Sequence, residues 1–165
     1  MSNFGLRIAT AAIFVSITGT AAAASAMTSF QVSATVISTC TVSATDLVFG
    51  NYSPVATTDT DSASTVTVQC TNLTPYAIGL GAGGGSGATV AERRMTKDAQ
   101  TLTYSLYQDL ARNTVWGDDF DVGGNAVSAV GDGLSQSHTL YGRIPKGQNV
   151  NIGTYTDTVL VTVNF

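Results

Sequence analysis

The sequence is poor in charge, in histidine and in cysteine. Only 11% of its 165 residues are charged, and the formal net charge is −4. An acidic balance without a cluster of Lys and Arg argues against binding to nucleic acids or to anionic membrane surfaces. One histidine and two cysteines do not make the ligand set of a zinc site. We therefore expect no nucleic-acid partner, no metal and no cofactor.

Long hydrophobic runs are missing as well. The longest apolar run, residues 8–17, contains Thr10 and Ser16 and is too short to span a membrane. It follows Arg7 and precedes the small residues 21–26, so residues 1–26 are typical of a cleaved secretory signal peptide. Cleavage would leave about 140 residues, which suits one exported domain with no membrane span in the mature chain.

Helical periodicity is not found in the mature part, whereas alternation of apolar and polar residues is frequent. Short alternating segments separated by turn residues favour an antiparallel β-sandwich. The polar connection 117–137 is long enough to contain a short strand or a mobile flap. The expected strands are residues 47–52, 65–70, 76–80, 102–107, 138–144 and, as the last and longest, 153–165, with a further polar connection at 57–64.

The two cysteines, Cys40 and Cys70, are expected to form a disulfide, because exported proteins fold in an oxidising compartment. Free thiols are the alternative. A bridge that closes about thirty residues would stabilise the fold by roughly 3–4 kcal/mol in the chain-entropy description. It would join the start of the first core strand to the end of the strand at residues 65–70.

No pattern in the chain predicts catalysis. The glycine-rich segment 81–87 lacks the Lys-Ser/Thr pair of a phosphate-binding loop, and His138 has no nucleophile signature nearby. Trp116 could stack on a sugar but is more often a core residue. We therefore expect no enzyme. The acidic residues that do not fit the spacing of a calcium loop are Asp118, Asp119, Asp121 and Asp132.

Residues 30–36 alternate strictly between apolar and polar side chains. The apolar members are Phe30, Val32, Ala34 and Val36, and signal cleavage would leave them close to the new N-terminus. Two interpretations are open. The segment is an ordinary first strand of its own domain, which the segment alone favours, or it is a strand that is given to another molecule.

A series of short motifs runs along the mature chain in a characteristic order. They are 40–42 (CTV), 47–52 (LVFGNY), 66–71 (VTVQCT), 94–95 (RM), 102–107 (LTYSLY), 115–118 (VWGD), 141–145 (YGRIP) and 153–159 (GTYTDTV). In order and spacing these motifs resemble the spore coat protein U domain family, which includes pilins of the archaic chaperone–usher pathway.

The resemblance implies an incomplete immunoglobulin-like sandwich that lacks its final strand and exposes an apolar groove. In such pilins a periplasmic chaperone fills the groove first, and the N-terminal strand of the next subunit replaces it at the outer-membrane usher. Residues 27–39 would be this donor extension, with Phe30, Val32, Ala34 and Val36 as the side chains that enter the groove.

The domain itself would comprise residues 40–165. Because the sequence ends with its last expected strand, we expect that no residues remain for a further strand, which together with the resemblance favours the donor interpretation. The groove residues would be Leu47, Phe49, Val159, Val161, Val163 and Phe165.

The function that follows is a structural subunit of a surface pilus, serving adhesion and biofilm formation. Its partners would be other pilin subunits, the chaperone and the usher, and its location the cell surface, reached through the periplasm. One domain favours a shaft or adaptor subunit over a tip adhesin. The alternative is a self-contained secreted sandwich that coats a surface or binds carbohydrate without polymerising, and a hydrolase is a distant third.

Overall fold

The computed structural model describes Gly19 and residues 22–165, and these residues contain strands but no helix. The chain divides into two compact units, Met1–Thr35 and Val36–Phe165. The described residues of the first unit form no regular secondary structure. Most of the predicted signal peptide lies outside the described residues. Within the described residues there is no helix with the length and apolarity needed to cross a membrane.

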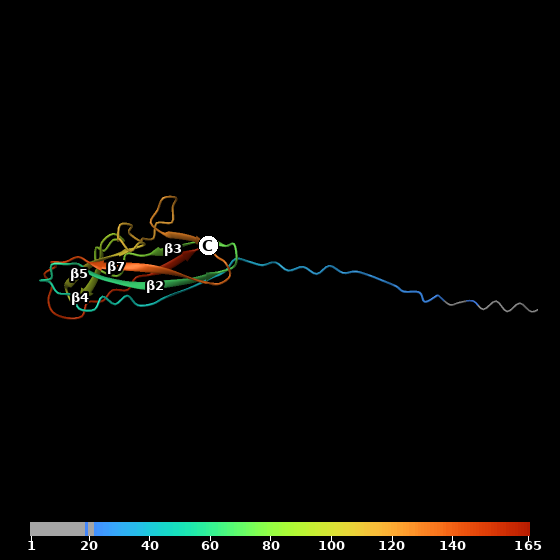
Figure 1. Cartoon of the computed structure of the whole chain (residues 1–165), viewed down its shortest axis with the longest axis horizontal. Coiled ribbons are helices and arrows are strands. Elements are labelled where there is room, and N and C mark those ends of the chain that lie inside the picture. Colours follow the sequence, from blue (N-terminus) through green and yellow to red (C-terminus); the bar gives the residue numbers. More distant parts are fainter. Residues whose placement is uncertain (1–18, 20–21) are drawn as a thin grey trace, which may run out of the picture. The chain divides into compact units, whose positions relative to one another are not determined.

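The second unit is a sandwich of two antiparallel sheets. In the described chain, one sheet has the order β1-β2-β7-β5-β4 and the other has the order β6-β3-β8. The longest strands, β2 and β7, run side by side (Figure 1). The strands are β1 (Cys40–Ala44), β2 (Thr60–Cys70), β3 (Pro75–Leu80), β4 (Arg93–Lys97), β5 (Gln100–Tyr107), β6 (Val127–Val130), β7 (Ser135–Ile144) and β8 (Val161–Asn164).

The core follows from the two-residue period of the strands. In β2 the inward side chains Ser64, Val66, Val68 and Cys70 are buried, while the residues between them face outward. Trp116 closes the core between the sheets, and its indole N–H donates to the carbonyl of Ile78 over 2.9 Å. The other buried apolar residues are Tyr76, Ile78, Leu80, Leu102, Tyr104, Leu106, Leu140 and Ile144.

The predicted disulfide is present. Cys40 and Cys70 are bonded, and they are also direct partners in the β1–β2 ladder. The bridge therefore locks the first residue of β1 to the last residue of β2, as the sequence predicts. Among the described residues there is no free cysteine.

Several predicted strands are confirmed, and others need correction. The strands expected at 76–80, 102–107 and 138–144 correspond to β3, β5 and β7, and the connection 117–137 does contain a short strand, β6. The polar segment 57–64 was expected to be a connection, but from Thr60 onward it belongs to β2 and pairs with β7.

Two other predicted strands are wrong, one entirely and one in its length. Residues 47–52 form no strand, and only Val161–Asn164 of the expected strand 153–165 is assigned to one. Residues 47–50 and 154–161 alternate in burial, which is what the sequence pattern reports, but both segments lack a continuous ladder of backbone hydrogen bonds. Strand β4 was not predicted, because its sequence Arg-Arg-Met-Thr-Lys carries only one apolar residue.

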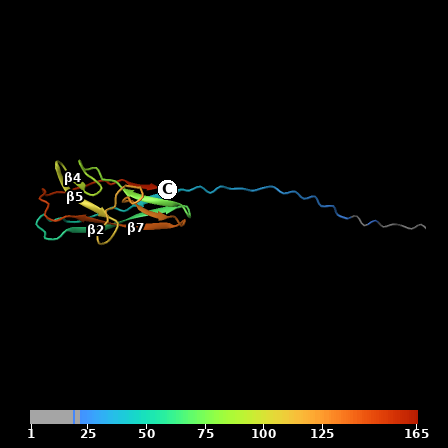
Figure 2. The same cartoon turned by 90° about the horizontal axis from the view of Figure 1, so that it is seen from above.

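The two ends of the sandwich differ. The disulfide end contains the start of β1, the β2–β3 turn (residues 71–74), the β6–β7 turn (131–134) and the C-terminus. The far end contains the connections 53–59 and 145–153. Figures 1 and 2 show the C-terminus at one end of the domain and strands β4 and β5 toward the other.

Candidate functional site: an open groove between the sheets

The first bank of the groove is the segment that follows β1. The β1–β2 ladder ends where the N–H of Thr45 donates to the carbonyl of Thr65. Beyond this point, side-chain hydroxyls of β2 bond to the bank in place of backbone N–H groups. Ser64 donates to the Thr45 carbonyl over 2.6 Å, and Ser62 donates to the Val48 carbonyl over 2.7 Å. Within the described chain, residues 46–52 make no backbone–backbone hydrogen bond.

Side chains of this bank turn inward onto the sheet. Leu47 and Phe49 pack against β7 at Gly142, where a Cβ atom would lie 2.6 Å from Leu47 Cδ2 and 2.7 Å from Phe49 Cζ. Phe49 also meets the ring of Tyr104 edge to face, with 6.0 Å between ring centroids. Glycine at position 142 therefore makes room for the apolar side chains of the first bank.

The second bank is the segment that leads into β8. Along it Tyr155, Asp157 and Val159 are half-buried and the residues between them are exposed. Thr156 exchanges two backbone hydrogen bonds with Thr96, and the Leu160 carbonyl accepts from the N–H of Gly81. The backbone N–H and C=O groups of the three half-buried residues have no partner within the described residues.

An apolar groove lies between these two banks. One part of it is a cavity of about 490 Å³, which is lined by Leu47, Phe49, Leu80, Val159 and Val161. A second part of about 850 Å³ continues between residues 47–54 and 150–156. The groove therefore combines an apolar lining with backbone groups that lack a ladder partner, and an extended chain placed in it would satisfy those groups and fill the cavity.

The carboxylate of Asp157 is the polar exception on the second bank. It accepts hydrogen bonds from the Tyr104 hydroxyl and from the N–H of Gly84, each over 2.7 Å. Burial raises the pKa of Tyr104, and the hydrogen bond to Asp157 raises it further. The Tyr104 hydroxyl therefore stays protonated at physiological pH and keeps donating to Asp157. Through Asp157, the second bank is hydrogen-bonded both to β5 and to the glycine-rich loop.

A buried arginine holds the corner beneath the glycine-rich loop. The side chain of Arg93 is fully buried, and its guanidinium donates to four backbone carbonyls over 2.6–2.8 Å. Burial lowers the pKa of Arg93, yet all its contacts favour the charged form that can donate to several carbonyls at once. The four acceptors are the carbonyls of Leu80, Gly81, Val90 and Trp116.

The structure places the predicted groove residues unevenly. Leu47, Phe49, Val159 and Val161 line the same cavity. Val163 packs against the core from β8, outside that lining, and Phe165 lies at the disulfide end beside a separate shallow hollow. Among the residues predicted for the donor strand, Phe30 and Val32 are 86% and 81% exposed, and Ala34 and Val36 are exposed as well.

The other candidates from the sequence have structural surroundings of their own. Trp116 is buried in the core, and the imidazole of His138 lies 2.9 Å from the Tyr76 hydroxyl. The described residues contain no group of three or more His, Cys, Asp or Glu that could hold a metal ion. Sequence reasoning missed the roles of Arg93 and of Ser62 and Ser64. The sequence did contain one signal for the serines: Ser64 is a polar residue at an inward position of the alternating strand β2, where a hydroxyl needs a hydrogen-bond partner.

Comparisons with known proteins give this groove a family context. Residues 26–162 match the Spore Coat Protein U domain. The chain belongs to the Spore Coat Protein U domain family. Protein U of Myxococcus xanthus is 40% identical to this family member over 128 residues, which are 71% of this chain and 70% of that protein.

A solved structure shares the fold. It is the CsuC–CsuE chaperone–tip adhesion subunit pre-assembly complex from archaic chaperone-usher Csu pili of Acinetobacter baumannii, with a TM-score of 0.58 and 25% identity. The match covers 79% of this chain and 40% of the chain in that complex, so this Spore Coat Protein U domain spans less than half of it. The fold is thus all-β and similar to that of chaperone–usher pilin subunits, and the family and this neighbour are structural proteins, not enzymes.

Proposed function

We propose that this chain is a structural subunit of a chaperone–usher surface pilus and that it polymerises by donor-strand exchange. The observation that carries the proposal is the groove, whose two banks both keep unpaired backbone groups along an apolar floor. An added strand would bond to the bank at residues 155–159 and place alternate side chains in the cavity.

The donor is the segment 30–36 of the next subunit. Its four apolar side chains repeat every second residue over about 20 Å, at roughly 3.3 Å per residue. Burying Phe30 and Val32, which are exposed in the single chain, is the hydrophobic gain of each link. The family match and the pilin fold of the solved complex support this assignment.

The route to the surface completes the proposal. Residues 1–26 direct export, a periplasmic chaperone covers the groove until an outer-membrane usher exchanges it for the donor strand, and the pilus serves adhesion and biofilm formation at the cell surface. The domain contains residues 40–165 and the donor extension residues 27–39.

A secreted coat protein that does not polymerise is the second candidate, favoured by the description of the family as a spore coat domain. Purification with and without a co-expressed chaperone separates the two. A pilin is recovered as a chaperone complex and otherwise mainly as polymer or aggregate with a small monomer fraction, whereas a coat protein with a closed fold is recovered as a stable monomer in both cases.

Placing a charge in the donor strand tests the proposal directly. Val32→Asp would bury an unpaired carboxylate in the groove of the neighbouring subunit, which costs several kcal/mol unless the group is protonated. We expect loss of surface fibres at a normal periplasmic level of subunit. Ser33→Asp, one residue away on the opposite face of the strand, is the matched control and should leave fibres intact.

Two results would contradict the donor assignment. Normal fibres from Val32→Asp would show that the segment does not enter a groove. Disappearance of the Val32→Asp subunit itself, with the chaperone present and Ser33→Asp unaffected, would show that residues 30–36 are a core strand of their own domain.

A further inference from the structure

Large apolar side chains are exposed together at the disulfide end. Val130 and Phe165 border one shallow hollow there, and Leu73 and Leu134 project from the two adjacent turns. All four are more than half exposed, and Leu73 is 78% exposed. We call these four residues the end patch. Exposed apolar patches on small domains are a feature of interaction surfaces.

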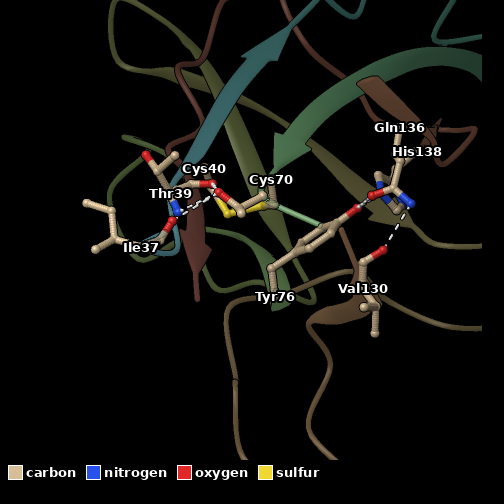
Figure 3. The surroundings of a disulfide bond; sticks show 9 residues. Ile37, Thr39, Cys40, Cys70, Tyr76, Val130, Gln136 and His138 are labelled. Atoms are coloured by element: carbon tan, nitrogen blue, oxygen red, sulfur yellow. Dashed lines mark hydrogen bonds between the residues drawn. A yellow bond between two sulfur atoms is a disulfide. The ribbon is translucent and has the colours of Figure 1, made fainter. Parts of the chain in front are cut away.

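The two turns that carry the patch are held firmly. The N–H of Leu73 donates to the Gly131 carbonyl over 2.8 Å, and the N–H of Gly133 donates to the Cys70 carbonyl over 3.1 Å. Cys70 is in turn bonded to Cys40 (Figure 3). The patch is therefore a preorganised surface, and contact with a partner would order few additional groups.

Leu73 has an unfavourable backbone conformation for its residue type. Its φ is +62°, in the left-handed region, which glycine and asparagine adopt at low energy and in which a bulky side chain is strained. The isolated domain gains nothing from a leucine that is both exposed and strained. Its presence is explained if the side chain is buried in an assembly.

The segment that precedes β1 indicates which molecule covers the patch. The Thr71 hydroxyl donates to the Ile37 carbonyl over 3.3 Å (Figure 3 shows Ile37 and Thr39 beside the disulfide). The N–H of Thr39 donates to the Thr71 hydroxyl over 3.2 Å, and the N–H of Thr71 donates to the Thr39 carbonyl over 3.0 Å. Residues from Ile37 onward are thus tied to the β2–β3 turn. A donor strand that ends at Val36 would leave almost no slack between the neighbour's groove and this end.

We propose that the end patch is a second contact between successive subunits, and that it packs against the far end of the subunit that receives the donor strand. This inference rests on the proposed function. Donor pairing antiparallel to β8 runs the strand from the neighbour's disulfide end to its far end, so Val36 emerges at the far end. There the neighbour exposes Val55 and Ile152. The contact is heterologous and does not close, as a fibre requires.

The test separates this contact from the groove. The double variant Leu73→Asn with Leu134→Ser removes two of the four patch side chains and relieves the left-handed strain at position 73, so the isolated subunit should melt at the same temperature or higher. A synthetic peptide of residues 27–39 should still bind its groove within about two-fold of the wild-type affinity. Fibres of the variant should dissociate in denaturant at least about ten-fold faster than wild-type fibres.

Val122→Ser is the matched control, because Val122 is an exposed apolar residue in the loop before β6, away from the patch. Its fibres should dissociate at the wild-type rate. Equal dissociation rates for the double variant and the wild type would overturn the inference, as would loss of peptide binding by the double variant. Failure of the peptide to bind the wild-type subunit would instead overturn the proposed function, and with it this inference.

Discussion

Two pairs of neighbouring segments in this domain share an alternating side-chain pattern and differ in their backbone. Strands β2 and β7 pair over ten residues, from Thr60 with Ile144 to Gln69 with Ser135. In the groove banks, residues 46–50 and 154–160 alternate in burial, but no ladder joins the two banks. Alternation therefore reports which face a segment buries, whereas a ladder requires a partner strand, and for the banks the described chain does not provide one.

The difference places stability and function in separate regions. The buried apolar residues lie mainly on β2, β3, β5 and β7, and the disulfide joins β1 to β2. The groove side contributes apolar surface that is only half covered. Regions with few backbone hydrogen bonds open at low free energy, and binding sites are drawn from such regions. We expect the closed side to determine the stability of the isolated subunit and the groove to respond to a donor.

The largest expected effect is on the buried corner. Arg93→Met would leave four carbonyls without their donor, and we expect the free energy of unfolding to fall by about 4 kcal/mol or more. Denaturant unfolding of the isolated subunit measures this. Arg94→Met is the control, since within the described residues the Arg94 side chain donates only to the Ser86 carbonyl, and its loss should cost less than about 1 kcal/mol. Equal effects would show that the corner is not a structural anchor.

Two side-chain truncations, one in the closed core and one on the groove bank, test whether the two regions differ in stability. Ile78→Ala, in the fully buried core, should destabilise the isolated subunit by about 3–5 kcal/mol. Val159→Ala, on the half-buried bank, should destabilise it by less than about 1 kcal/mol and should also weaken capture of the peptide 27–39. Similar losses of stability for the two variants would mean that the groove side is as closed as the core.

Hydrogen exchange gives a test without mutation. The amides of Val66 and Val68 lie in a central strand and should exchange slowly. The amides of Asp157 and Val159 should exchange rapidly in the isolated subunit and become protected when the peptide binds. Rapid exchange that the bound peptide leaves unchanged would place the donor elsewhere.

The smallest effect concerns pH. Burial lowers the pKa of His138 below its usual value of 6.5, so the folded state disfavours the charged imidazole. The unfolded chain then binds more protons as the pH falls below about 6.5, and stability should decrease there and level off below the folded-state pKa. Thermal melts of His138→Gln should lack this part of the pH dependence. An unchanged pH profile would exclude His138 as its source.

Much of the closed side could be predicted from local sequence. The alternating segment 65–70 and the short apolar segments 102–107 and 138–144 match β2, β5 and β7, and the two cysteines predict their bridge because the chain is expected to be exported. The prediction failed where partners decide the outcome. Residues 153–165 looked like the longest strand because Val159, Val161, Val163 and Phe165 recur at every second position, yet most of the segment has no ladder.

The sequence by itself determined the all-β class, the faces of the main strands, the disulfide and the family, because each depends on local periodicity, residue type or motif order. Only the tertiary structure decided which edges remain open, that Arg93 is buried among four carbonyls, and that Leu73 and Phe165 lie at the same end of the domain. These features depend on contacts between residues far apart in the chain. Such contacts leave no periodic trace in the sequence, since a hydrogen-bond partner or a neighbouring turn is chosen by packing and not by the segment itself.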